Sequence, residues 1–301
     1  MITEKKFGDG QNYWMNINSD HLNEDLDLYK AYGIDEEIIS YAMDKNERAR
    51  IEYDSESTTF TLIYNVAKNT KINNHYKTTP MTFLVKNKRL ITISNSGNAH
   101  IVQAIEDYLN KNPEISIFKF LFSSLFIISD NYFPKIEEMN KERNYINDML
   151  KEKTTKKNLL ALSDLETGVV YFVSATKQNT VLLEQLKKNP IFQTLDDIEK
   201  EQLEDTLIEA SQLVEMSQLA SQILQQLSGT YNNILNNNLN DTMKTLTVLS
   251  ILLTIPTIVT GFFGMNMPLP LENNILGWII AIGISVIGWF VLSFILHFVL
   301  K

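Results

Sequence analysis

The sequence contains no cysteine, and its 301 residues include only 7 prolines and 11 glycines. Without cysteine there is no disulfide framework and no thiolate metal site. Basic residues are also in the minority, with 27 lysines and arginines against 36 aspartates and glutamates and a net charge of -9. This balance argues against nucleic acid as a partner, because nucleic-acid-binding domains present a basic face. It suits a surface that attracts divalent cations.

The chain also lacks the local signals of an enzyme or a nucleotide site. Its 4 histidines are isolated, and none has the spacing of a metal-binding pair. There is no Gly-rich phosphate loop, and no Ser/His/Asp set that the order of the chain would bring together. We therefore expect no enzymatic activity, no cofactor and no nucleotide.

Charge is missing altogether from residues 245–271. The 19 residues 245–263 come close to the roughly 20 that a helix needs to cross a bilayer core. At about 100° per residue, five small or hydroxyl residues of this segment fall within an arc of roughly 80°. Asn240 and Met243 extend the same stripe toward the N-terminus. The five residues, called the hydroxyl stripe below, are Thr247, Ser250, Thr254, Thr257 and Gly261.

A lipid-facing helix gains nothing from such a stripe, and two interpretations stay open at this point. Small and hydroxyl residues let membrane helices approach closely, so the stripe fits a helix–helix contact. It fits equally well the wall of a water-filled pore built by several copies of the helix. Pro256 frees one carbonyl, near Leu252, and allows a bend. A second uncharged segment, residues 275–300, predicts a second membrane helix.

The membrane segment continues a much longer helical pattern that starts near Leu195. No proline occurs between Pro190 and Pro256. An unbroken helix over residues 195–263 would be about 100 Å long, far longer than a bilayer is thick. It must extend from the membrane as a stalk, and its apolar stripe requires copies beside it. That stripe is Ala210, Leu213, Ala220, Ile223, Leu227, Tyr231 and Ile234.

The N-terminal part predicts a sheet covered by helices. β-branched and aromatic residues indicate strands at 50–53 and 58–64 and a hairpin of 81–85 with 89–93. Apolar spacing and capping residues indicate helices at 35–42, 98–109, 115–153 (interrupted only at Pro134) and 158–188.

The tripeptide Gly264-Met265-Asn266 ends the first of the two C-terminal hydrophobic segments. Together with residues 208–216, 237–240, 243–244 and 255–259, it resembles the CorA family of magnesium channels. The related zinc-transporting branch usually has Ile in place of Met, so Met265 favours the magnesium branch. The resemblance implies a homopentameric membrane channel, in which an α/β cytosolic domain is followed by a long stalk helix and two transmembrane helices.

The expected boundaries follow from this resemblance and from the hydrophobic segments. They are a cytosolic α/β domain with a helical C-terminal half at 1–194, a stalk at 195–244, a pore-lining helix at 245–264, an external loop at 265–274 and a second membrane helix at 275–300. Lys244 and Lys301 flank the two spans, the loop has no basic residue, and residues 1–10 lack an apolar signal core. We therefore expect a multi-pass protein of the plasma membrane with both termini in the cytosol.

The resemblance also assigns residue roles. Asn266, with Gly264 and Met265, would capture hydrated Mg²⁺. Leu246 would act as a hydrophobic gate, and Asp205 would belong to a regulatory Mg²⁺ site between subunits. Gly229 falls where many relatives have a second stalk aspartate, which leaves the number of such sites open. The expected pore-lining residues are Asn240, Met243, Ser250, Thr254, Thr257 and Gly261.

The function that this implies is Mg²⁺ influx down the electrochemical gradient, closed by intracellular Mg²⁺ bound to the cytosolic domain. Mg²⁺ would be both substrate and regulatory ligand. Two alternatives stay open. The chain could transport zinc, Co²⁺ or Ni²⁺, although the lack of cysteine speaks against a dedicated zinc pathway. It could also be a membrane-anchored sensor or scaffold, which would leave the hydroxyl stripe and Asn266 without a role.

Overall fold

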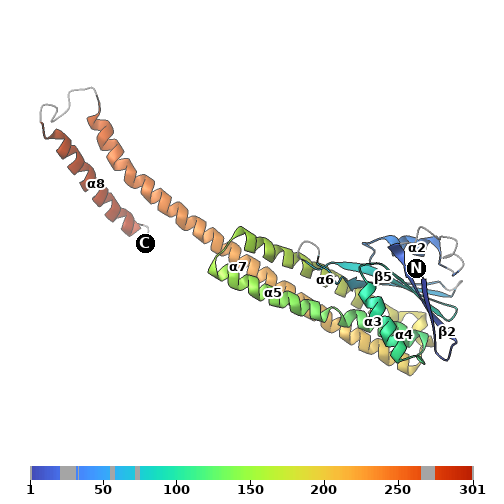
Figure 1. Ribbon diagram of the computed structural model, residues 1–301. Coiled ribbons are helices and arrows are strands. Elements are labelled where there is room, and N and C mark those ends of the chain that lie inside the picture. Colours follow the sequence, from blue (N-terminus) through green and yellow to red (C-terminus); the bar gives the residue numbers. More distant parts are fainter. Residues whose placement is uncertain are drawn as a thin grey trace. The chain divides into compact units, whose positions relative to one another are not determined.

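The computed structural model describes residues 2–20, 32, 34–54, 58–71, 75–265 and 275–299. Internal contacts divide the chain into two units, Met1–Ser228 and Gly229–Lys301. The first unit contains a sheet and most of the helices, and the second is helical (Figure 1). Helix α7, Asp197–Phe263, runs through the point of division. We describe each unit by itself.

A six-stranded sheet is the framework of the first unit. Its spatial order is β1-β2-β6-β5-β4-β3, and all neighbours are antiparallel except β2 and β6, which are parallel. The expected hairpin is confirmed: its two-residue turn holds Asn87 and Lys88 at φ of 48° and 63°, as in a type I′ turn. The strands are β1 Ile2–Phe7, β2 Asn12–Asn18, β3 Arg50–Asp54, β4 Thr59–Ala67, β5 Thr78–Lys86 and β6 Arg89–Ser94.

Helices cover both faces of the sheet. Helix α2, Glu36–Met43, buries Ile38 and Ile39 in a cluster with Met15 and other side chains of β2, β5 and β6. Neighbouring residues of a strand point to opposite faces, so Trp14 lies on the other side, where its ring meets Phe120 of α4 at 5.9 Å. The core of the first unit is thus built on two sides of one sheet.

The helical part of the first unit largely follows the sequence pattern. The helical segment expected over 115–153, with an interruption at Pro134, is two helices: α4 ends at Asp130 and α5 begins at Phe133, so the interruption lies just before Pro134. Pro134 lies in the first turn of α5, where a proline loses no helical hydrogen bond. The helices are α3 Ala99–Lys111, α4 Ile117–Asp130, α5 Phe133–Glu152 and α6 Lys156–Lys188, followed by the short η2 Pro190–Thr194.

Helix α7 is continuous, as its sequence predicts, and its first part belongs to the first unit. Its buried residues there repeat at spacings of 3 and 4, which is a heptad pattern. They are Leu203, Thr206, Ala210, Leu213, Ser217, Ala220 and Leu224. Two residues of the apolar stripe expected from the sequence, Ile223 and Ile234, are instead exposed in the single chain. Two buried hydroxyl residues, Thr206 and Ser217, belong to the same pattern at positions that the expected apolar stripe does not include.

The start of α7 is fixed by a reciprocal cap. The backbone N–H of Glu199 donates to Asp196 Oδ1 at 2.8 Å, and Asp196 N–H donates back to Glu199 Oε2 at 3.1 Å. Ser116, the N-cap of α4, donates to Glu199 Oε1 at 2.5 Å. One carboxylate therefore serves the N-termini of two helices, where the helix dipole favours negative charge.

In the second unit, α8, Gly277–Val299, runs back beside the C-terminal part of α7 (Figure 1). The half-buried side of α8 carries the small residues Gly277, Ala281, Ser285 and Gly288. A Cβ added at Gly288 would lie only 3.0 Å from Ile255 Cγ2 of α7. Small residues permit such close approach of membrane helices. They therefore account for the packing of α8 on α7.

Candidate functional site

The hydroxyl stripe of α7 is fully described, and every residue of it is exposed in the single chain. Asn240, Met243 and Leu246, which continue it toward the first unit, are exposed as well. All of these residues lie on one unbroken helix, so their angular relation follows directly from helix geometry. The structure therefore presents the predicted stripe as a continuous open face.

The side of α7 that meets α8 is a different one. The half-buried residues of this part of the helix are Val248, Leu252, Ile255, Pro256, Val259 and Phe263. At about 100° per residue their mean direction lies roughly 180° from that of the hydroxyl stripe. Packing within the chain thus uses the apolar side of α7 and leaves the stripe free. The stripe therefore does not meet the chain's own second membrane helix, and of the two interpretations both a contact between copies and a pore wall stay open.

The hydroxyl groups of the stripe donate their protons to their own helix. Thr254 donates to the carbonyl of Ser250 at 3.0 Å, and Thr257 donates to that of Leu253 at 2.8 Å. Thr247 and Ser250 make the same bond, four residues back, at 2.8 Å. A hydroxyl that has donated its proton still offers oxygen lone pairs. The stripe is therefore a row of hydrogen-bond acceptors.

The C-terminal end of α7 closes on a glycine that has little space for a side chain. The N–H of Gly264 donates to the carbonyl of Thr260 at 2.9 Å. A Cβ at Gly264 would lie 3.0 Å from that same oxygen, closer than nearly all real Cβ contacts. Met265 is exposed, and the predicted Asn266 lies outside the described residues. Of the selectivity motif, the structure thus places Gly264 and Met265 at the end of the acceptor row.

The inner end of the hydroxyl stripe borders a cavity of about 590 Å³ in the second unit. Asn240, Met243 and Thr247 line it from α7, and Leu296 lines it from the last turns of α8. Met243 is 58% exposed and Leu246 is 62% exposed. The proposed inner mouth and gate therefore stand uncovered in a single chain.

Asp205, the predicted regulatory residue, is exposed on the first part of α7. Its neighbour Glu204 forms an ion pair with Lys187 at 3.0 Å. Glu209, one turn further, is partly buried. This burial, with the negative charge of Asp130 adding to it, raises the pKa of Glu209. Within the described part of a single chain, no three acidic or histidine side chains come together as a metal site.

Among the described residues, three helices have the length and composition to cross a membrane, namely α6, α7 and α8. Helix α6 is a different case from the other two, because it buries Leu162, Phe172 and Leu183 in the first unit. The candidate windows of α7 and α8 contain no buried residue. The two segments expected from the sequence are thus the two that a bilayer would cover.

Comparison with known proteins decides the family. The model of the family described as "CorA-like Mg2+ transporter protein" matches residues 9–299. The chain belongs to this CorA-like family. A curated relative, the Cobalt/magnesium transport protein CorA of Methanocaldococcus jannaschii, is 25% identical over 291 residues, which are 95% of this chain and 90% of the relative. The family is one of transporters, not a known family of enzymes.

Solved structures share the fold. The complete structure of the CorA magnesium transporter from Methanocaldococcus jannaschii superposes with a TM-score of 0.79 at 24% identity, over 97% of this chain and 92% of that one. The full-length CmaX protein superposes with a TM-score of 0.66 at 12% identity, over 94% and 88%. The CorA-like fold expected from the sequence is therefore confirmed. The roles given to Asn266, Asp205 and the hydroxyl stripe stay predictions.

Proposed function

We propose that the CorA-like chain assembles as a homopentamer in the plasma membrane and conducts Mg²⁺ into the cell. The observation that carries the proposal is the orientation of the hydroxyl stripe. It is exposed, it lies opposite the side that packs on α8, and its oxygens act as acceptors. Five such faces around one axis form an aqueous conduit whose wall accepts hydrogen bonds.

An acceptor wall suits a hydrated divalent cation. Mg²⁺ gives up its water reluctantly, and the water shell of a cation directs its protons outward. Hydroxyl oxygens that have already donated can accept those protons without removing the water. No charged side chain lies along the stripe, so the ion is not held tightly. Entry is driven by the membrane potential, at about 2.3 kcal/mol per charge per 100 mV.

The two ends of the conduit have different tasks. At the outer end, amide oxygens of Asn266 and the carbonyl of Gly264 receive the hydrated ion. At the inner end, Leu246 forms a hydrophobic constriction that stops ions by dewetting, and Asn240 forms the inner mouth. Leu296 lines the same cavity as Lys244, so the end of α8 and the start of the pore segment lie on the same side of the membrane. This supports a topology with both termini in the cytosol.

Intracellular Mg²⁺ closes the channel by binding between the stalks of neighbouring subunits. Asp205 is exposed on α7 and has no ion-pair partner among the described residues, so it is available to a metal shared with another chain. When the metal leaves, carboxylate repulsion loosens the bundle. In an Asp205→Ala channel, currents measured at high internal Mg²⁺ should persist where the wild-type current stops. Unchanged closure would contradict the role of Asp205.

Co²⁺ is the second candidate substrate, because the curated relative is named for cobalt as well as magnesium. Both ions bind six ligands as hydrated cations. A ring of amide side chains from several subunits contacts the water shell of the ion more than the metal itself. Zinc has less support, since the described histidines, His75, His100 and His297, do not form a metal cluster in the described structure. Competition between Mg²⁺, Co²⁺ and Zn²⁺ for uptake ranks the three.

The decisive experiment is Mg²⁺ uptake into liposomes that contain the purified protein. Asn266→Ala should abolish uptake. Thr257→Val removes an acceptor from the hydroxyl stripe and should lower the rate severalfold. Thr260→Val is the matched control, because Thr260 is also exposed and bonded to a carbonyl of its own helix, at 2.8 Å, but lies off the stripe. Equal loss for both threonines would contradict the pore-lining face, and uptake by Asn266→Ala would contradict the capture site.

A further inference from the structure

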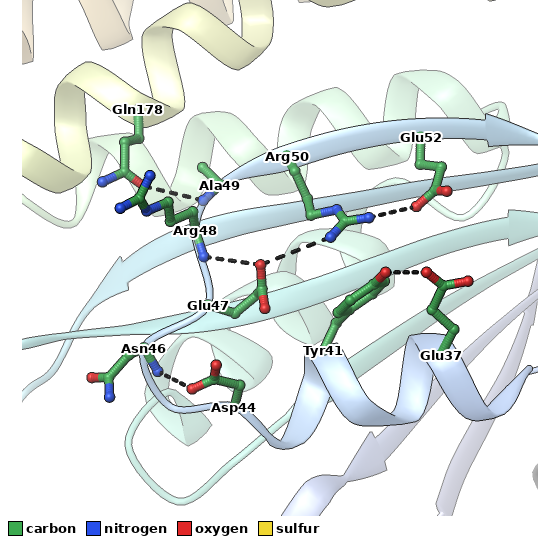
Figure 2. A network of polar contacts seen from close by, with 10 residues as sticks. All are labelled: Glu37, Tyr41, Asp44, Asn46, Glu47, Arg48, Ala49, Arg50, Glu52 and Gln178. Atoms are coloured by element: carbon green, nitrogen blue, oxygen red, sulfur yellow. Dashed lines mark hydrogen bonds and ion pairs between the residues drawn. The ribbon is translucent and has the colours of Figure 1, made fainter.

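A second polar cavity lies in the first unit, away from any residue that the transport function uses. It measures about 490 Å³. Three segments that are distant in sequence form it: the connection from α2 to β3, the strands β4 and β5, and the middle of α6. Figure 2 shows the side of this region where the connection from α2 to β3 passes below Gln178 of α6.

The base of the cavity is held in place by amide side chains. Strand β3 pairs with β4 only as far as Ile63, so the backbone of Asn65 has no strand partner on that side. Asn179 of α6 takes this place: its Oδ1 accepts from Asn65 N–H at 2.9 Å, and its Nδ2 donates to Asn65 O at 2.8 Å. The Asn65 side chain, 7% exposed, lines the cavity.

Gln178 joins the three segments. Its Oε1 accepts from the backbone N–H of Ala49 at 3.2 Å and from Asn65 Nδ2 at 3.4 Å. Its Nε2 donates to Ser174 Oγ, one turn earlier on α6, at 3.2 Å. The hydrogen bond from Ala49 to Gln178 is visible in Figure 2. The cavity therefore has a wall fixed by hydrogen bonds and is built from groups that can also meet a polar ligand.

Three basic side chains line the cavity, namely Lys45, Arg48 and Lys77. None of them has an ion-pair partner among the described residues. The one acidic residue of the lining, Glu47, is engaged by its neighbours Arg48 and Arg50. Its Oε1 accepts from the backbone N–H of Arg48 at 3.2 Å and faces Arg50 at 4.0 Å (Figure 2). In a chain of net charge -9, this gathering of uncompensated cations favours an anion.

An aromatic ring completes the lining. Tyr171 is 42% exposed, and its ring stacks on His75 with a centroid distance of 6.0 Å and an interplanar angle of 9°. His75 itself is buried, so Tyr171 is held in a fixed orientation at the edge of the cavity. A rigid ring beside basic groups offers a stacking surface for a planar ligand group.

We propose that this cavity binds a nucleoside phosphate. The phosphates meet Arg48, Lys45 and Lys77, because charge-assisted bonds from guanidinium and ammonium groups are the strongest that an exposed site offers. The base stacks on Tyr171, and the amides of Asn65 and Gln178 supply polar contacts. The sequence predicts no nucleotide site because it contains no contiguous Gly-rich loop. Here the basic groups come from the connection before β3 and from the segment before β5, and only folding brings them together.

Binding is measured on the full-length purified protein by calorimetry, with adenosine triphosphate, inorganic triphosphate and adenosine as three separate probes. Adenosine triphosphate should bind most tightly. The double variant Arg48→Glu, Lys77→Glu should weaken its binding at least tenfold. Lys177→Glu is the matched control, since Lys177 is an exposed cation on α6 next to Gln178 but does not line the cavity. It should change the affinity less than twofold.

The role of the ring is tested separately. Tyr171→Ala should weaken the binding of adenosine triphosphate severalfold and leave the binding of inorganic triphosphate unchanged. Tyr171→Phe keeps the aromatic ring and should bind adenosine triphosphate as tightly as the wild type. The substituted side chains are solvent-accessible, and unchanged thermal unfolding confirms that the variants fold. Absence of nucleotide binding, equal loss for Lys177→Glu, or equal affinity for nucleotide and inorganic triphosphate would each overturn the proposal. None of these readouts depends on transport.

Discussion

The two parts of α7 use the same residue types in opposite ways. In the first unit, Thr206 and Ser217 are buried, and they reach other helices: Thr206 donates to the carbonyl of Phe122, and Ser217 lies 3.1 Å from Thr176 Oγ1. In the second unit, Thr254 and Thr257 are exposed and bond only to their own helix in the described structure. A threonine therefore indicates packing or pore lining only through the surroundings that the fold gives it.

The two units as a whole also differ in how much they bury within one chain. The first unit buries a core on both faces of a sheet, complete within one chain. In the second unit, no described residue from 232 onward is buried. Apolar helices of this kind gain their environment from lipid and from copies of themselves. The first unit is thus complete within one chain, whereas the second unit leaves its apolar side chains for lipid or further protein to cover.

The largest expected difference between the units is the loss of stability when an aromatic side chain is removed. Phe172 on α6 is completely buried, and its ring meets Tyr132 at 5.0 Å. Phe172→Ala should cost about 3–5 kcal/mol and lower the thermal midpoint of the first unit by roughly 10 °C. Phe262→Ala in the second unit removes the same atoms from a side chain that is 49% exposed. Thermal unfolding of the purified protein should show little change for it, and a similar drop for both would break the comparison.

A smaller effect is expected where α7 and α8 meet. Gly288→Leu must displace Ile255, since a Cβ already lies 3.0 Å from it, and overpacking of this kind costs about 1–3 kcal/mol. Uptake in liposomes and the amount of assembled protein should both fall. Gly283→Leu adds the same side chain on the same helix, where nothing lies within 4 Å. It should retain transport. If Gly283→Leu were as damaging, the packing face of α8 would be assigned to the wrong side.

Much of this fold follows from local sequence. The hairpin of β5 and β6, the unbroken α7 and the hydroxyl stripe are all confirmed as structural features, because period, turn residues and the lack of proline are local signals. Strands β1 and β2 were not predicted. Half of the residues of β1, ITEKKF, are charged, as an edge strand can be. The parallel pairing of β2 with β6 joins residues about 76 positions apart, which no local pattern shows.

The candidate site could likewise be predicted only in part. The spacing of Thr247 to Gly261 predicted one polar face, but the sequence could not say whether that face meets α8. The answer required the small residues of α8 to be placed against Ile255. The cavity of the first unit could not be predicted at all. Its basic residues are separated by two strands in the chain, and Asn65 acquires its position only because β3 is too short to cover β4.

The smallest expected difference between the units is in how their stability depends on pH. In the first unit, Glu138 accepts from Tyr76 OH at 2.5 Å and pairs with Lys71 at 3.0 Å. The hydrogen bond from Tyr76, with that from Lys71, holds the pKa of Glu138 below its ordinary value of 4.5. Burial, with the bond to Glu138 adding to it, raises the pKa of Tyr76 to about 12. In the described part of the second unit no ion pair occurs.

A carboxyl group whose pKa is lowered by folding stabilises the folded state above its unfolded-state pKa, and this contribution is lost as the pH falls through the folded value. Glu138→Gln should therefore destabilise the first unit at pH 7, by less than about 1 kcal/mol because the Glu138 side chain is 52% exposed. The two thermal midpoints should converge as the pH falls through the lowered pKa of Glu138. Glu137→Gln, a change at the exposed neighbouring residue, should follow the wild type at every pH. If the thermal midpoints of wild type and Glu138→Gln differed by the same amount at every pH, packing and not charge would stabilise the contact of α5 with the segment before β5. The contrast with the second unit would then rest on burial alone.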